Sequence, residues 1–291
     1  MMDKVHGGDC GPHMSGHTLA RKIIQQGYYW STLQTDCNDH VRRCHKCQIY
    51  AKSQKLPPRE LYNMTTPWPF STWGIDIVGE ISPSGSNGHA FILVVVDYFT
   101  KWVEAESYKT LNAKKVAHFI RRNIICRYGV PSEIISDNGT HFEGAANKVM
   151  EEYGITQHKY SPYRPQTNGA VEAAKKNLKN ILSKMTSTNR DWPDKLSYAL
   201  WGYRTTERVS TGATPFSLTY GMEVVLPAEL EVPSLRVMLE NQVNEIEWVQ
   251  ARYNELAMLD EKRLKAAYHH QGYQKRIVRA FNQKVKGRVF E

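Results

Sequence analysis

The stretch that decides the fold runs from Ser136 to Glu172 and reads SDNGTHFEGAANKVMEEYGITQHKYSPYRPQTNGAVE. The β-branched run at 133–136 predicts a buried strand that ends at the turn residues Asp137–Gly139. Turn residues at Thr167–Gly169 then predict the start of a helix, with Glu172 in its first turn. Two carboxylates therefore stand at the ends of different elements, where their side chains can converge on one point.

A third acidic residue lies upstream in an unusual place. Asp76 interrupts the strand-like run Trp73–Val78, and a half-buried carboxylate normally has a partner or a metal because its burial is costly. Three carboxylates repel one another, and a hard divalent cation such as Mg²⁺ removes this repulsion while keeping positions open for water and phosphate. Two such ions ~3.5–4 Å apart stabilise both the attacking and the leaving oxygen of a phosphoryl displacement.

Each acid also has an ordinary explanation. Asp137 can form an Asx turn with the Asn138–Gly139 pair, and Glu172 can simply decorate a helix N-terminus. Either residue alone favours that explanation, whereas the three acids together favour the metal site.

The motifs around these acids resemble the DDE core of retroviral-type integrases, and most closely those of Ty3/gypsy long-terminal-repeat retrotransposons. They are Ser136-Asp-Asn-Gly-Thr140 and Ser161-Pro-Tyr-Arg-Pro-Gln-Thr-Asn-Gly-Ala-Val-Glu172, and the resemblance extends from about Val5 to Tyr220. It implies that Asp76, Asp137 and Glu172 are catalytic and bind Mg²⁺. One spacing departs from the family: 34 residues separate the last two acids, one fewer than usual.

Cysteine and histidine residues concentrate before residue 50. The pairs His6-x6-His13 and Cys44-x2-Cys47 supply two imidazoles and two thiolates, which suit a tetrahedral structural Zn²⁺. The cysteine pair alone is a weak signal that redox chemistry explains equally well, but the four residues together resemble the HHCC zinc-binding module of integrases. The remaining candidates are predicted to be bystanders, and only His17 is a credible substitute ligand: Cys10, Cys37, His17, His40 and His45.

The chain is expected to divide into an HHCC zinc-binding domain (1–52), a Pro-rich linker (53–71), a catalytic core (72–225) and a helical, basic extension (226–291). We expect an α/β class, with a ribonuclease H-like integrase core after a small helical domain. The chain stops where integrases usually continue into a C-terminal β-barrel, so a truncated fragment of a longer polyprotein is expected.

Within the core, apolar patterns predict both strands and helices. The apolar run at 91–96 is also far shorter than the ~20 residues of a membrane span, and Asp97 is interpreted as structural. The predicted strands are Thr72–Glu80, Ala90–Thr100, Lys101–Tyr108 and Ile134–Ser136; the predicted helices are 112–128 ended by Gly129, one from about Asn168, and one over Trp192–Arg204.

Several features favour nucleic acid as a partner. The net charge is +9, and the final 31 residues hold nine Lys or Arg and two Glu, a composition that usually meets nucleic acid. Lys175, Lys176 and Lys179 lie beside Glu172 on the predicted helix and can neutralise phosphates, although Glu–Lys pairs that merely support the helix explain them too. By resemblance, the DNA contacts also include Tyr163, Gln166 and Asn168, for which ordinary turn chemistry is the alternative.

The leading hypothesis is a retrotransposon integrase that uses two metal ions for 3′-end processing and strand transfer. It implies catalytic Mg²⁺ or Mn²⁺, structural Zn²⁺, double-stranded element and target DNA, a homo-oligomer, and a nuclear location after cytoplasmic particle assembly, without secretion or a membrane. A degenerate or domesticated DNA-binding protein is the second hypothesis, favoured by Lys175, the short spacing and the missing barrel. A ribonuclease H-type nuclease is the third, but it does not explain the zinc module.

Overall fold

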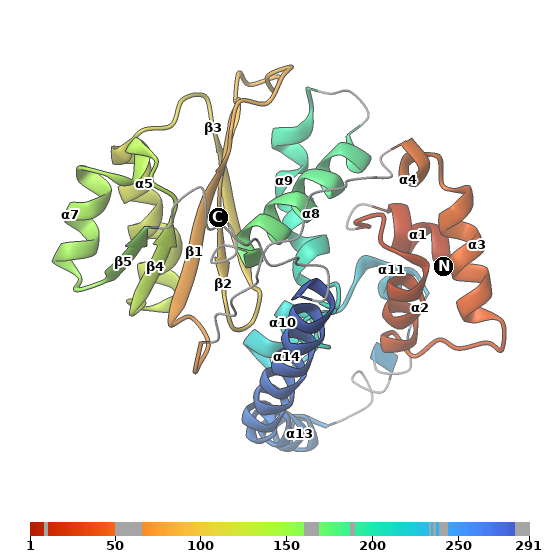
Figure 1. The fold of residues 1–291 in the computed structure, drawn as a ribbon. Coiled ribbons are helices and arrows are strands. Elements are labelled where there is room, and N and C mark those ends of the chain that lie inside the picture. The colour runs from red at the N-terminus through yellow and green to blue at the C-terminus, as the bar shows by residue number, and fades with distance from the viewer. Residues whose placement is uncertain are drawn as a thin grey trace, which may run out of the picture.

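The computed structural model describes most of the chain, and the account below concerns the described residues: 1–8, 11–49, 66–159, 169–186, 190–232, 234, 237–238 and 244–282. Its centre is a five-stranded sheet with helices on both faces (Figure 1). The strands are β1 (Thr72–Val78), β2 (Phe91–Asp97), β3 (Val103–Tyr108), β4 (Glu133–Ser136) and β5 (Thr156–Lys159).

The sheet is mixed. Its strand order is β3-β2-β1-β4-β5; β1, β2 and β3 pair antiparallel, whereas β4 pairs parallel with both β1 and β5. The antiparallel part forms from consecutive strands, and the parallel part needs helical crossovers, which the intervening helices supply. This is the α/β class that the sequence predicted.

The two faces of the sheet follow from side-chain alternation along each strand. In β1, Trp73 and Ile75 point to the face covered by α5 (Ala113–Phe119) and α7 (Ala145–Glu152). Val78 points to the opposite face, against α8 (Gly169–Met185) and α9 (Trp192–Arg204). Because alternation is strict, Asp76 belongs to the α8 face of the sheet.

The helix expected over 112–128 forms as three joined segments. They are α5, a π-helical stretch η1 (Ile120–Ile125) and α6 (Cys126–Tyr128). Asn112 caps the start by accepting a hydrogen bond from the backbone N–H of Lys115 at 3.0 Å. Gly129 ends the last segment at φ 89°, a conformation that glycine adopts without steric cost.

The third strand begins later than the sequence predicted, at Val103 instead of Lys101. The cause is Asp97, whose carboxylate accepts hydrogen bonds from the Thr100 amide at 2.7 Å and the Thr100 hydroxyl at 2.6 Å. These bonds hold a tight turn in which Lys101 has φ 63°. The first strand likewise ends at Val78, before the predicted Glu80.

The helix α8 carries an apolar stripe against the sheet and against α9. Its buried residues recur at helical spacing, and both helices begin as the sequence predicted. The buried positions of α8 are Val171, Ala174, Leu178, Ile181 and Leu182. This packing fixes the rotation of α8, and therefore the direction in which its other faces point.

Four short helices form the N-terminal part: α1 (Met2–Gly7), α2 (Gly16–Gln25), α3 (Leu33–Arg43) and α4 (His45–Ile49). They enclose a small apolar core that also takes in Ala228 of the later helix α11 (Pro227–Glu231). Lys22 is buried and donates to the Thr205 hydroxyl at 3.1 Å. The N-terminal helices are thus attached to the segment that follows α9.

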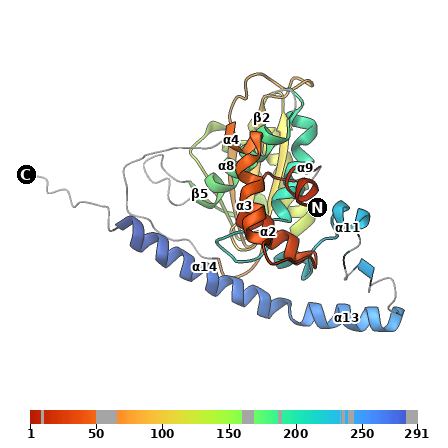
Figure 2. The same ribbon diagram turned by 90° about the vertical axis from the view of Figure 1, so that its right-hand side faces the viewer.

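Beyond α10 (Pro215–Tyr220), two helices in sequence form a rod that extends along one side of the molecule (Figure 2). They are α13 (Glu245–Ala257) and α14 (Leu259–Asn282). The side chains of Lys262 and Arg263 donate to backbone carbonyls of Gly221 and Leu218, at 2.7 and 3.0 Å, and so attach α14 to the rest of the chain. No helix among the described residues is both long and apolar enough to cross a membrane.

Candidate functional site

Asp76 lies in the middle of β1 and is 4% exposed. Its Oδ1 accepts a hydrogen bond from the Ile77 amide at 2.7 Å. Its Oδ2 accepts one from the Lys175 ammonium of α8 at 2.9 Å. The acid that seemed out of place in the sequence therefore faces α8 and is paired there.

Asp137 reaches the same place through the strand register. The parallel pairing of β1 with β4 sets Gly74 opposite Ile135, so continuing each strand by two residues sets Asp76 level with Asp137, on strands ~4.8 Å apart. Asp137 also accepts a hydrogen bond from the Gly139 amide at 2.9 Å. The Asx turn that the sequence analysis gave as the ordinary explanation of Asp137 is present, and it orients the carboxylate.

Glu172 occupies the first turn of α8. Burial raises the pKa of its carboxyl, the Lys175 charge opposes this, and Asp76 and Asp137 raise the pKa further, Asp76 also through a hydrogen bond. The Glu172 carboxyl on α8 is therefore near enough to Asp76 on β1 and to Asp137 after β4 for their charges to interact. Carboxylates that interact in this way are the kind of group that a divalent cation with oxygen ligands can bring together. Their oxygens do not form a gathered ligand set here: among the described residues, the donor atoms that already lie together are those of His6, His13, Cys44 and Cys47.

The predicted DNA contacts fall into three groups. Lys176 and Lys179 are exposed on α8, four and seven residues after Glu172 and so on its side of the helix. Lys175 is partly buried and bonded to Asp76. The remaining three, Tyr163, Gln166 and Asn168, lie outside the described residues.

The predicted zinc ligands also come together. The donor atoms of His6, His13, Cys44 and Cys47 all lie within 4.8 Å of one another. Cys44 Sγ is 3.4 Å from His13 Nδ1, and Cys47 Sγ is 3.4 Å from His6 Nε2. A tetrahedral zinc site with ordinary Zn–S and Zn–N bonds places sulfur and nitrogen ~3.5 Å apart, so the spacing fits Zn²⁺.

The electrostatics of this cluster suit the metal as well. Burial lowers the pKa of both His6 and His13 to about 4, so the imidazoles are neutral at pH 7, the form that binds zinc. The substitute candidate His17 instead bonds Gln34 at 3.2 Å. His40 is a bystander in direct contact, its ring centroid 5.2 Å from that of His6.

Sequence reasoning missed one residue at the zinc cluster. Lys184, in the last turn of α8, donates to the His13 carbonyl at 3.1 Å and lies 3.6 Å from Cys47 Sγ. Its charge opposes the rise that burial imposes on the pKa of the Cys47 thiol. The helix that carries Glu172 thus touches the zinc cluster at its other end.

This contact predicts that Lys184→Met weakens zinc binding by about tenfold, the scale seen when groups around metal ligands are lost. Competition with a chromogenic chelator measures the effect on the zinc-loaded chain. Lys179→Met is the matched control on the same helix, because Lys179 is exposed. Equal zinc affinity in the wild type and Lys184→Met would show that this contact does not support the cluster.

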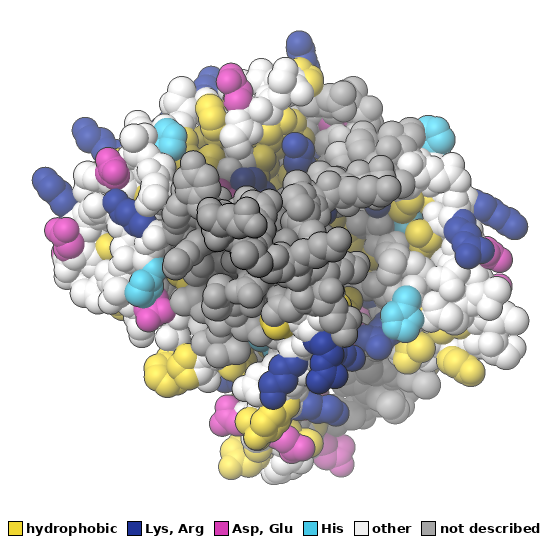
Figure 3. Space-filling model, in the orientation of Figure 1, with side chains coloured by type: hydrophobic (Ala, Val, Ile, Leu, Met, Phe, Trp, Pro, Cys, Tyr) yellow, Lys and Arg dark blue, Asp and Glu magenta, His cyan; other side chains and the backbone are white. Residues whose placement is uncertain are grey.

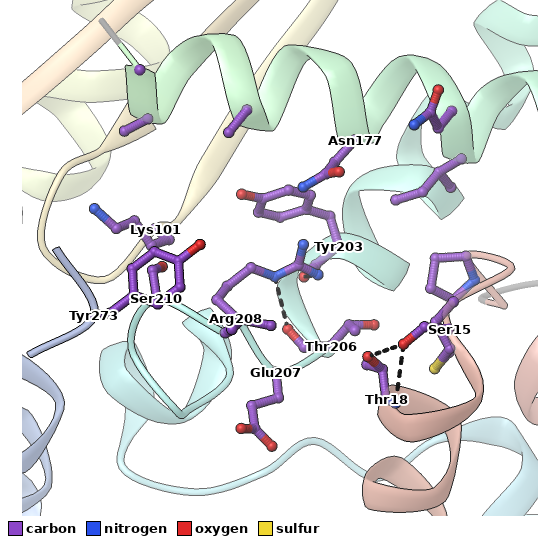
Figure 4. Close-up of a pocket in the computed structure, with 18 of the residues that line it drawn as sticks. Ser15, Thr18, Lys101, Asn177, Tyr203, Thr206, Glu207, Arg208, Ser210 and Tyr273 are labelled. Carbon is purple, nitrogen blue, oxygen red and sulfur yellow. Dashed lines mark hydrogen bonds between the residues drawn. The ribbon is translucent and has the colours of Figure 1, made fainter. Parts of the chain in front are cut away.

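A cavity among the described residues is lined by none of the three carboxylates. It encloses about 640 Å³ between the N-terminal helices, α8, the 203–210 segment and α14 (Figure 4). Its cations are engaged by backbone carbonyls: Arg208 donates to that of Tyr203 at 2.8 Å, and Lys101 donates to that of Tyr98 at 2.6 Å. The carboxylates are therefore the better candidate for the chemistry.

Comparison with known proteins relates one segment of the chain to a family. Residues 67–165, which contain the five strands, match the integrase core domain family. This segment therefore forms an integrase core domain, as the resemblance predicted.

Relatives over a longer region are the Tf2-3 and Tf2-4 transposon polyproteins of Schizosaccharomyces pombe. Each is 28% identical over 230 residues, which is 75% of this chain and 16% of the polyprotein. The chain is thus a distant homologue of a Ty3/gypsy-type polyprotein and spans about one sixth of its length.

A solved structure shares the fold. It is the simian T-cell lymphotropic virus intasome in complex with PP2A regulatory subunit B56 gamma, with a TM-score of 0.51 and 21% identity. The match covers 78% of this chain and 74% of the chain in that structure.

Proposed function

We propose that this chain is a retrotransposon integrase that processes the 3′ ends of element DNA and joins them to target DNA. The observation that carries the proposal is the electrostatic interaction of Glu172 with Asp76 and Asp137. The two aspartates lie within the segment that matches the integrase core domain family, and Glu172 lies just beyond it. The elements that hold them, β1, the end of β4 and the first turn of α8, are fixed by the sheet and its packing.

In this proposal the three carboxylates hold Mg²⁺ or Mn²⁺, which supplies activation of the attacking oxygen and stabilisation of the leaving one. Asp76 is held by the buried strand and Asp137 by its Asx turn, so both oxygen donors are positioned before DNA binds. Water would attack near the 3′ end of the element, and the freed 3′-hydroxyl would then attack a target phosphodiester. Positioning supplies much of the rate enhancement, without a covalent protein intermediate.

The proposed partner is double-stranded DNA. Exposed Lys176 and Lys179 continue the side of α8 that carries Glu172, where backbone phosphates need neutralising; Tyr163, Gln166 and Asn168 are the further contacts proposed by resemblance. We also propose a homo-oligomer that works in the nucleus, a structural Zn²⁺ in the N-terminal module, and the domain division at 52, 71 and 225.

The experiment that tests the function is a strand-transfer assay with Mg²⁺ or Mn²⁺ on oligonucleotides that carry the element ends. Joined products support an integrase. Cleavage of the RNA strand in an RNA–DNA hybrid, without joining, would instead support a ribonuclease H-type nuclease.

One observation favours a catalytically inactive DNA-binding protein as the second candidate. Lys175 Nζ lies 2.9 Å from Asp76 Oδ2, so a lysine already occupies an oxygen that the metal needs. DNA binding without joining, at any metal concentration, is the result that this candidate predicts.

The helix α14 is predicted to add sequence-independent affinity for DNA. Figure 3 shows Lys and Arg side chains gathered over it. The exposed basic residues of this helix include Lys265, Lys275, Arg276 and Arg279. Replacing these four with Gln removes up to four phosphate contacts, so the slope of log affinity against log salt should become shallower by up to ~3.6.

Binding to duplex DNA, followed by fluorescence anisotropy at several salt concentrations, measures that slope. Lys262 and Arg263 are left in place because they attach α14 to the chain. An unchanged slope would exclude α14 from the DNA interface.

A further inference from the structure

Lys175 is held inside the acidic site. It lies on α8 three residues after Glu172, and its ammonium is 2.9 Å from Asp76 Oδ2. The side chains of Lys175 and Asp76 are 28% and 5% exposed, so water screens this pair less than it screens an ordinary surface ion pair. The Lys175 charge also opposes the rise in the pKa of Glu172.

The charges at the site explain why a lysine is stable there. Three ionised carboxylates carry three negative charges, and the Lys175 ammonium neutralises one of them. Asp76 meanwhile has both oxygens engaged, Oδ1 by the Ile77 amide and Oδ2 by Lys175. A divalent cation that takes Oδ2 as a ligand therefore meets a positive charge already at that oxygen.

We infer that Lys175 is a resident counter-cation that competes with the catalytic divalent metal for Asp76, and that metal binding releases it toward a DNA phosphate. This inference rests on the proposed function, since it concerns the metal of that same site. Released Lys175 stands one residue before Lys176 and four before Lys179, both exposed on the same helix. Metal and DNA then strengthen each other's binding, because such coupling is reciprocal.

The first test measures Mn²⁺ binding to the zinc-loaded full chain, with free Mn²⁺ followed by electron paramagnetic resonance. Lys175→Met removes the charge and keeps the length of the side chain. Because a positive charge next to the metal is lost, this variant should bind Mn²⁺ about five- to tenfold more tightly than the wild type. Lys148→Met is the matched control, an exposed lysine on α7, which covers the other face of the sheet, and it should leave the affinity unchanged.

The outcomes separate the inference from the function beneath it. Equal Mn²⁺ affinity in the wild type and Lys175→Met would overturn the competition while leaving the metal site in place. Failure of all three proteins to bind Mn²⁺, or binding that survives Asp137→Asn unchanged, would remove the metal site itself, and with it both the proposed function and the inference.

The second test addresses the release of Lys175. With Mn²⁺ present, the slope of log DNA affinity against log salt should be shallower by about 0.9 for Lys175→Met than for the wild type, the loss of one phosphate contact. Without metal the two slopes should agree, because Lys175 is then held by Asp76. Equal slopes in both conditions would show that Lys175 stays inside the site.

Discussion

Glu172→Gln is expected to reduce metal-dependent strand transfer by at least about a thousandfold, since metal electrostatics and positioning carry the proposed reaction. The change removes one negative charge from the site and nearly preserves the shape of the side chain. Stability should not fall, because burial and two neighbouring carboxylates disfavour the charge of Glu172 in the folded chain. Both 3′-end processing and joining should be lost together, because they use the same carboxylates.

Asp137→Asn gives an independent version of the same result. An Asn oxygen can still accept the hydrogen bond from the Gly139 amide that now holds Asp137, so the turn should survive while a ligand charge is lost. Asp76→Asn is less clean, because it also weakens the bond to Lys175.

Gel-based joining assays measure these losses, and DNA affinity is measured in parallel. Glu151→Gln is the matched control, an exposed glutamate on α7, which covers the other face of the sheet, and it should keep full activity. Joining by Glu172→Gln at a rate near wild type would exclude Glu172 from catalysis. A parallel loss of folding or DNA binding would show that the effect is structural.

Much of this site could be predicted from the sequence because its elements have local signals. A β-branched run before Asp137 and turn residues before Glu172 locate both acids at the ends of elements, and the register of β1 with β4 then brings Asp76 level with Asp137. The zinc ligands were predicted from residue types and spacing together with the resemblance to the HHCC module of integrases, and their donor atoms lie together. Acidic residues at the ends of buried elements, and His and Cys residues at short fixed spacings, are uncommon without a function, and they can be recognised from the sequence alone.

The contacts of the lysines could not be predicted in this way. Lys175 bonds a residue 99 positions away, and Lys184 lies against one 137 positions away. Helical spacing places each lysine on a face of α8, but only the packing of that helix on the sheet decides what each face meets. The late start of β3 has a partly similar cause. Asp97 holds the turn before β3 through Thr100, three residues on, but its other carboxylate oxygen accepts a bond from the Phe70 amide, 27 residues before it.

Removal of zinc is expected to unfold the N-terminal helices α1–α4 and leave the integrase core folded. Their apolar core is small, and a module of this size rarely folds without a metal or other cross-link. Zinc binding to sites of this kind contributes on the order of 10 kcal/mol to folding. In this structure the sulfur and nitrogen atoms of these side chains lie 3.4 Å apart. Without zinc, no shared metal ion holds the thiols and neutral imidazoles together.

Hydrogen exchange resolved by residue measures this outcome in the chain treated with a chelator, and in Cys44→Ser and Cys47→Ser. Protection of the Leu19 and Ile23 amides in α2 should fall toward the value of an unfolded peptide, whereas that of Val94 and Val95 in the central strand β2 should persist. The exposed Cys126 provides the matched control, since Cys126→Ser should keep zinc and full protection. Unchanged protection in α2 after complete zinc loss would mean that the contacts with the rest of the chain, such as that of Lys22 with Thr205, suffice to fold the module.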